Sequence, residues 1–141
     1  MSAEINKAVV RRYTEAVDTE ARSAIRAYLA EGFVGHMPGA PGPLTRDGFE
    51  QFASAFYSAF PDLRHTIEDL AAEGDRVAGR FTLRGTHQRE FQGIPATGRE
   101  ITFGAIVLCR IAGGKIAEIW MQMDGIALMQ QVGAIPAQPA A

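Results

Sequence analysis

The chain has little of several features that commonly reveal a function. Its 141 residues include one cysteine, Cys109, which excludes an intrachain disulfide. No apolar run approaches the about 20 residues that a membrane-spanning helix needs, and the first residues lack the apolar core of a signal peptide. These absences are typical of a reducing compartment, and we expect a cytoplasmic protein without a membrane partner.

An excess of charge of either sign is also missing. The formal net charge is -2, the isoelectric point is about 5.9, and the 14 lysines and arginines are scattered along the chain. Phosphate backbones attract proteins that carry clustered basic residues. A nucleic acid is therefore not an expected partner.

Motifs for metals and cofactors are absent as well. The three histidines have none of the close spacings that zinc sites use, and no Cys-x-x-Cys occurs. No glycine-rich phosphate loop precedes a helix, and no nucleophile motif is recognisable. The sequence predicts neither a bound metal nor a cofactor.

What is present is the composition of an ordinary globular domain, with 47% hydrophobic and 21% charged residues. A chain of this length can bury a real core as one domain. We expect residues 1–135 to form that domain and residues 136–141 to be a disordered tail.

The first half of the chain has helical periodicity. Apolar residues spaced by three and four predict a helix from Ala3 to Val17, and Asp18 and Thr19 can cap a shorter helix that ends before Gly32. The segment Phe33–Met37 is a strand candidate. A third helix follows the N-cap Thr45, and its apolar stripe consists of Phe49, Phe52, Phe56 and Phe60.

The second half alternates with the period of strands. The expected strands are 63–72, 77–84, 101–111 and 115–123. Gly74-Asp75 and Gly113-Gly114 are hairpin turns, and Gly125–Gln131 is a last helix. Helices followed by antiparallel strands imply an α+β fold in which the helices pack on one face of a curved antiparallel sheet.

Imidazoles are the first candidates for acid/base chemistry, because only they titrate near neutrality without perturbation. His36 and His87 end strands, where pockets open, and for both a site role and an ordinary structural role stay open. His65 follows Arg64 in a charged segment, which favours a structural role. Asp124 can be a general base or the N-cap of the last helix, and the cap is favoured.

The segment from Gly113 to Asp124 holds only two carboxylates, Glu118 and Asp124. Its middle carries the single tryptophan and two methionines, so this strand can line an apolar pocket or an interface. A buried Glu118 would suit proton transfer, but an ion pair with Lys115 or Arg110 is the simpler interpretation.

Five phrases occur in a characteristic order: Phe60-Pro61-Asp62-Leu63, Glu73-Gly74-Asp75-Arg76-Val77, Arg84-Gly85-Thr86-His87, Gly93-Ile94-Pro95-Ala96-Thr97-Gly98-Arg99, and Gly114-Lys115-Ile116 with Glu118 and Trp120. Their order and spacing resemble the SnoaL-like polyketide cyclase family, often labelled ester cyclases, in the NTF2-like superfamily. The resemblance extends from the first helix to Gly133. It implies a cone-shaped α+β barrel with an apolar cavity between helices and sheet, and a homodimer formed through the outer face of the sheet.

The resemblance also implies a chemistry and a departure from it. Anthracycline cyclases of this family close a ring by an aldol reaction in which an aspartate on the last strand is the general acid/base. The resemblance places that aspartate at Met121, a nearby histidine at Val107 and a polar asparagine near Phe52. Methionine and valine cannot move a proton, so aldol cyclisation by this mechanism is disfavoured.

If the inward face of the family is kept, Phe103, Val107, Met121 and Met123 look into the cavity, and Trp120 and Asp124 look outward unless a bulge swaps them. The residues expected to bind a substrate are Tyr13, Phe33, Phe52, Phe56, Phe103, Val107, Trp120, Met121 and Met123.

Two hypotheses follow. The first is a protein that binds a small apolar, polyketide-like or cyclic molecule and, if it is an enzyme, performs cofactor-free cyclisation, isomerisation or epoxide opening with His36, His87 or Asp124. The second is a non-catalytic ligand-binding or dimeric interaction module. Polar groups that converge on the cavity favour an enzyme, whereas a wholly apolar wall favours binding alone.

Overall fold

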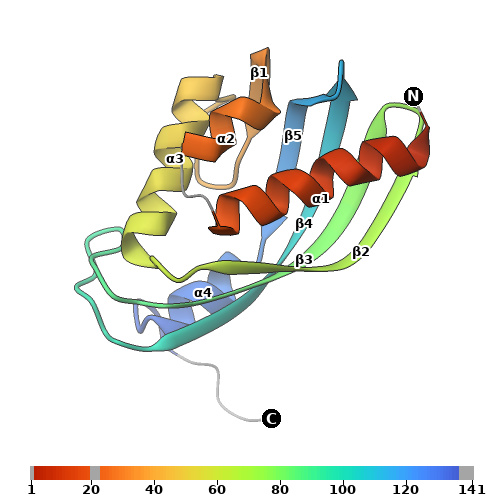
Figure 1. Cartoon of the computed structure of the whole chain (residues 1–141). Coiled ribbons are helices and arrows are strands. Elements are labelled where there is room, and N and C mark those ends of the chain that lie inside the picture. The colour runs from red at the N-terminus through yellow and green to blue at the C-terminus, as the bar shows by residue number, and fades with distance from the viewer. Residues whose placement is uncertain (1, 20–22, 137–141) are drawn as a thin grey trace.

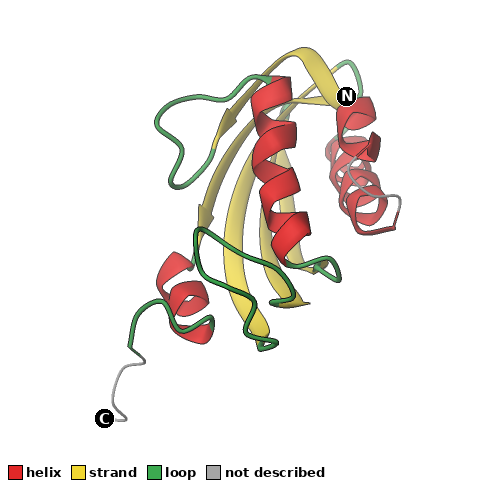
Figure 2. Cartoon of the chain, turned by 90° about the vertical axis from the view of Figure 1, so that its left-hand side faces the viewer, coloured by secondary structure: helices red, strands yellow, loops and turns green. Residues whose placement is uncertain are grey.

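The computed structural model of the chain describes residues 2–19 and 23–136. The elements are α1 (Ala3–Thr19), α2 (Ser23–Tyr28), β1 (Leu29–His36), α3 (Arg46–Ala59), β2 (Arg64–Glu73), β3 (Arg76–Thr86), β4 (Glu100–Ala112), β5 (Lys115–Met123) and α4 (Gly125–Gln131). Helices α1, α2 and α3 lie over one face of a curved sheet, and α4 lies at one end of it (Figures 1 and 2). The predicted α+β fold is confirmed.

The five strands form one sheet in the order β1-β5-β4-β3-β2. The pairs β2 with β3, β3 with β4, and β4 with β5 are antiparallel, as predicted. Strand β1 instead pairs with β5 in parallel, so the sheet is mixed at this edge. Side chains alternate in the same way in both kinds of pairing, which is why the sequence pattern does not reveal the direction of β1.

The junction of α2 and β1 differs from the sequence prediction. Leu29, which the helical spacing assigned to the second helix, begins β1, pairs with Ile116 and is fully buried. Residue Ala21, expected on the same helix, lies outside the described residues. The predicted N-cap of α3 is present, since the Thr45 side chain accepts a hydrogen bond from the Gly48 backbone at 3.2 Å.

Two glycine-containing turns join the long strands as predicted. Gly74 has a φ of +58°, and Gly113 and Gly114 have φ values of +59° and +75°, in the left-handed region that favours glycine. These turns set the register that points one face of each strand toward the helices. On β4 that face consists of Ile101, Phe103, Ala105, Val107, Cys109 and Ile111, all buried.

None of the described helices is both long and apolar enough to cross a membrane. The expected tail at 136–141 falls, apart from Pro136, outside the described residues.

Candidate functional site

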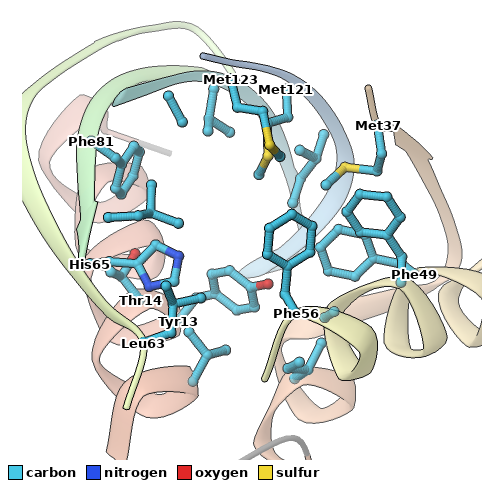
Figure 3. Close-up of a pocket in the computed structure, with 18 of the residues that line it drawn as sticks. Tyr13, Thr14, Met37, Phe49, Phe56, Leu63, His65, Phe81, Met121 and Met123 are labelled. Carbon is cyan, nitrogen blue, oxygen red and sulfur yellow. The ribbon is translucent and has the colours of Figure 1, made fainter. Parts of the chain in front are cut away.

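A cavity lies between the helices and the concave face of the sheet, with a volume of about 100 Å³ (Figure 3). Its wall is largely apolar and draws on α1, α2, α3 and strands β2 to β5. From α3 it takes two aromatic rings, Phe52 and Phe56, and from β4 and β5 it takes Val107, Met121 and Met123. The sheet reaches the cavity through alternate residues, because side chains two apart share a face.

Six of the nine residues that the sequence predicted to bind a ligand line this cavity: Tyr13, Phe52, Phe56, Val107, Met121 and Met123. The other three do not. Phe33 is buried against Phe49 at 5.0 Å between ring centroids, and Phe103 is buried in the core. Trp120 lies on the opposite face of the sheet, in the same row as His36. The binding roles themselves stay predictions.

One histidine lines the cavity, and it is His65. Its Nδ1 lies 2.8 Å from Oδ1 of Asp18, and its backbone N–H donates to Oδ2 of the same carboxylate at 2.7 Å. The two side chains are 18% and 10% exposed, so the pair is largely removed from solvent. Asp18 thus holds both the ring and the backbone of His65.

This arrangement fixes the chemistry of the imidazole. When Nδ1–H donates to a carboxylate, Nε2 of the neutral ring is left with a lone pair that can take a proton. In Figure 3 the His65 ring stands in the cavity wall with one nitrogen toward the cavity. Nδ1 is the nitrogen that lies beside Asp18. A histidine oriented by a carboxylate is the general-base arrangement of several enzyme classes.

Other polar groups of the wall are hydroxyls and a thiol. The Thr14 hydroxyl donates to the backbone oxygen of Val10 at 2.8 Å. Burial raises the pKa of Tyr13, and burial followed by the nearby Asp18 charge raises the pKa of Tyr57. Burial also raises the pKa of the Cys109 thiol to about 12. At neutral pH these groups keep their protons and cannot act as bases.

The three acid/base candidates from the sequence lie elsewhere. His36 is on the outer face of the sheet, stacked on Trp120 at 5.2 Å between ring centroids. His87 is fully buried with its Nδ1 2.9 Å from Oγ1 of Thr97. The Asp124 side chain accepts a hydrogen bond from the Ala127 backbone at 3.0 Å, as the N-cap of α4. None of the three lines the cavity, so their positions do not support the predicted catalytic roles.

The sequence was interpreted as giving His65 a structural role. A pattern that places His65 at the cavity was nevertheless present in the sequence. Leu63, His65 and Ile67 alternate with charged or polar residues, and this period-two pattern places His65 on the apolar face of β2. The partner Asp18 was considered only as a helix cap. In the structure α1 continues to Thr19, and the Asp18 side chain turns to β2 instead.

Glu118 on β5 forms an ion pair with Arg110, as the simpler of the two sequence interpretations predicted. Glu118 binds His36 Nε2 at 2.7 Å and Arg110 Nε at 3.3 Å on the outer face of the sheet. The hydrogen bond from His36, followed by that from Arg110, holds the pKa of Glu118 below its usual value. In the described ranges 2–19 and 23–136, no three His, Cys, Asp or Glu side chains are placed to share a metal ion.

A curved sheet covered by helices, with an apolar cavity and one histidine–aspartate pair in its wall, defines an α+β domain with an internal cavity. Comparison with known proteins gives the family. The model of the SnoaL-like polyketide cyclase family matches residues 7–132. Aklanonic acid methyl ester cyclase DauD of Streptomyces sp. (strain C5) is 33% identical over 143 residues, covering 94% of this chain and 83% of that protein.

Solved structures agree with this result. AclR of Streptomyces galilaeus, a candidate hydroxylase, superposes with a TM-score of 0.90 at 27% identity, covering 98% of this chain and 87% of AclR. IdmH of Streptomyces antibioticus, a candidate polyketide cyclase, gives a TM-score of 0.81 at 30% identity, covering 91% of this chain and 98% of IdmH. The chain belongs to the SnoaL-like polyketide cyclase family.

Proposed function

We propose that this protein binds a small apolar, cyclic or polyketide-like molecule in its cavity and acts on it by cofactor-free acid/base chemistry. His65 is the proposed acid and base, and Asp18 is its positioning partner. The observation that carries the proposal is the hydrogen-bonded pair at 2.8 Å whose free ring nitrogen faces an apolar cavity. This role replaces the assignment of His36, His87 or Asp124.

The chemistry follows from the pair. Nε2 of His65 takes a proton from a carbon next to a carbonyl, and the C–H electron pair passes into an enolate. Asp18 stabilises the imidazolium, which then returns the proton to carbon or oxygen as the product forms. Isomerisation and ring closure both begin with this step. General acid/base catalysis of this kind contributes about 10²–10⁴-fold to a rate.

The relatives support cyclase or isomerase activity by this acid/base chemistry, since the names of two of them state an aklanonic acid methyl ester cyclase activity. The family resemblance places the catalytic aspartate at Met121, which lines the cavity and has no proton to transfer. The acid/base group therefore has to come from another element, and His65 on β2 is the cavity residue whose side chain can supply it.

Proton abstraction can be measured without the natural substrate. Acetophenone has exchangeable protons on its methyl group, and their replacement by deuterium in D₂O is followed by proton NMR. We expect the protein to accelerate this exchange and the His65→Gln variant to lose about 10²–10⁴-fold of the acceleration. The His36→Gln variant tests the competing assignment. Loss of exchange in His36→Gln, with His65→Gln unaffected, would contradict the proposal.

The second candidate function is ligand binding without catalysis. It is supported by the wall itself, in which apolar side chains greatly outnumber polar ones. The same experiment separates the two candidates. A protein that binds acetophenone but gives no exchange above the buffer rate is a binding module.

We also propose a homodimer formed through the outer face of the sheet, as expected from the family resemblance. The support is an apolar side chain in the middle of this face, Ile106 on β4, which is 54% exposed. Light scattering should give about twice the 15.2 kDa mass of one chain. The Ile106→Glu variant should give the mass of one chain, and a monomeric parent protein would refute this arrangement.

A further inference from the structure

Three methionines in the cavity wall are a feature that the proposed function does not use. The chain has five methionines, and Met37, Met121 and Met123 line the cavity. In Figure 3 these three stand along one side of the cavity, and His65 lies across it from Met121 and Met123. A ligand whose reacting atom meets the imidazole therefore extends toward the methionines.

The pairing of β4 with β5 explains why these side chains reach into the cavity. Met121 and Met123 are two residues apart on β5, so they share a face. Their cross-strand partners on β4 are Val107 and Ala105, whose side chains are shorter. Met37 directly follows β1 and is 8% exposed. The ends of the three methionine side chains, and not the strands themselves, therefore set the limit of the cavity on this side.

The size of the cavity limits the body of the ligand. Its volume is about 100 Å³, whereas pockets for drug-sized ligands have about 300–1,000 Å³. An engineered apolar cavity of about 150 Å³ in another protein holds one benzene ring. The present cavity therefore accommodates about one ring. Methionine side chains are unbranched and flexible, so they can close on the outline of such a ring.

We infer that Met37, Met121 and Met123 determine the size of the ligand, and that they restrict it to a compact apolar body of about one ring beyond the group that reacts at His65. This inference rests on the proposed function, because it uses the same cavity and the same base. It gives two sides of the cavity separate roles. The methionines select the ligand by size and transfer no proton, whereas His65 transfers the proton and does not limit the size.

The test uses two probes that differ only in size. Acetophenone and 2-acetonaphthone carry the same methyl ketone on one ring and on two fused rings, and binding of each is measured by ligand-observed NMR titration. We expect the protein to bind acetophenone at least ten-fold more tightly, because a single extra methylene in an apolar pocket already changes specificity by about 10–200-fold. Met121→Ala and Met123→Ala should each improve binding of 2-acetonaphthone at least ten-fold.

The matched control is Met129→Ala, which removes the same atoms from α4. Met129 packs against the hydrophobic core but is not part of the cavity wall. This variant should keep the preference for acetophenone. Equal binding of the two probes to the parent protein, or an unchanged preference in both Met121→Ala and Met123→Ala, would overturn the inference.

A change in the opposite direction keeps the test decisive if the alanine variants are too unstable to fold. Ala105 lines the cavity on β4, directly opposite Met123. Ala105→Leu adds atoms where the methionine ends, so it should fill part of the cavity and weaken acetophenone binding at least ten-fold. Urea unfolding shows whether each variant is folded. Unchanged acetophenone binding to folded Ala105→Leu would overturn the size limit.

The inference and the proposed function can fail separately. His65→Gln should lose deuterium exchange and keep the preference for the smaller probe. If Met121→Ala abolishes the size preference while His65→Gln leaves deuterium exchange unchanged, the size limit stands and the acid/base role falls. If His65→Gln abolishes exchange while Met121→Ala and Met123→Ala keep the preference, the acid/base role stands and the size limit falls.

Discussion

The two faces of the sheet each hold a histidine–carboxylate pair, and the pairs are nearly equal in length. His65 and Asp18 are 2.8 Å apart on the inner face, and His36 and Glu118 are 2.7 Å apart on the outer face. The outer pair shares its carboxylate with Arg110, and its ring lies flat on Trp120. The inner carboxylate instead binds the histidine twice, through the ring and the backbone.

The difference lies in what surrounds each ring. The His36 side chain is 34% exposed, and the guanidinium of Arg76 lies 5.2 Å from the centroid of the Trp120 ring on which His36 stacks. The groups of this cluster are held by hydrogen bonds, ring stacking and a cation–π contact with one another. His65 has an apolar cavity on one side and a carboxylate on the other. A short hydrogen bond alone therefore does not identify a catalytic pair, whereas the space beside the free nitrogen does.

The largest expected effect is on the rate of deuterium exchange, when the carboxylate of the inner pair, Asp18, is replaced and compared with Glu118 of the outer pair. The amide introduced by Asp18→Asn can present its NH₂ to Nδ1 of His65, which moves the ring proton to Nε2 and removes the base. We expect deuterium exchange of acetophenone to fall by about 10²-fold or more. Glu118→Gln should leave the exchange rate within about two-fold, and equal losses in both variants would erase the distinction between the pairs.

A second comparison places the same new carboxylate on either face of β5. Met121→Asp puts it into the apolar cavity and should destabilise the protein by about 2–4 kcal/mol at pH 7. Gln122→Asp puts it on the outer face, opposite Ile106. At a protein concentration at which the chain is monomeric, it should cost less than about 0.5 kcal/mol. Urea unfolding measures both free energies.

The loss of unfolding free energy in Met121→Asp should depend on pH. Burial raises the pKa of the new carboxyl in Met121→Asp. The loss is therefore complete above that raised pKa, shrinks as the pH falls from there to about 4, the pKa of the carboxyl in the unfolded chain, and is constant below it. A loss that does not change with pH would show that the introduced carboxylate reaches water. If Met121→Asp also fails to gain aldol cyclase activity, the missing aspartate is not the only departure from the family chemistry.

The smallest expected effect concerns the outer pair. The pKa of Glu118 is lowered by the hydrogen bond from His36 and then by that from Arg110. A lowered carboxyl pKa stabilises the fold above the ordinary glutamate pKa, and this contribution is lost as the pH falls through the lowered value. The stability difference between the parent and Glu118→Gln should therefore shrink from pH 7 to pH 3. Glu100→Gln, an exposed carboxylate of β4, should show a smaller change.

Much of the fold could be predicted from local signals. The turn glycines Gly74 and Gly113 have backbone conformations that other residues adopt with strain, and Thr45 is chemically suited to cap α3. The alternation of apolar and polar residues along each strand then predicted which residues face the helices. The parallel direction of β1 could not be predicted, because no local pattern records which strand lies beside it.

The candidate site was less accessible to sequence reasoning. His65 and Asp18 are 47 residues apart, and their contact depends on how α1 crosses β2. Spacing rules describe one element at a time, so they gave Asp18 a capping role and His65 a structural one. His36 was predicted to lie near the cavity mouth because it ends a strand, but the pleat points its side chain to the outer face.

The parallel pairing of β1 with β5 has a consequence for the order in which the chain folds. His36 and Glu118 meet across 82 residues of intervening chain, whereas β2, β3, β4 and β5 are joined by successive antiparallel pairings. Closing a long loop costs more entropy than closing a hairpin, and contacts distant in sequence form slowly. The antiparallel strands should therefore assemble first, and the docking of β1 should be a late step on the folding pathway.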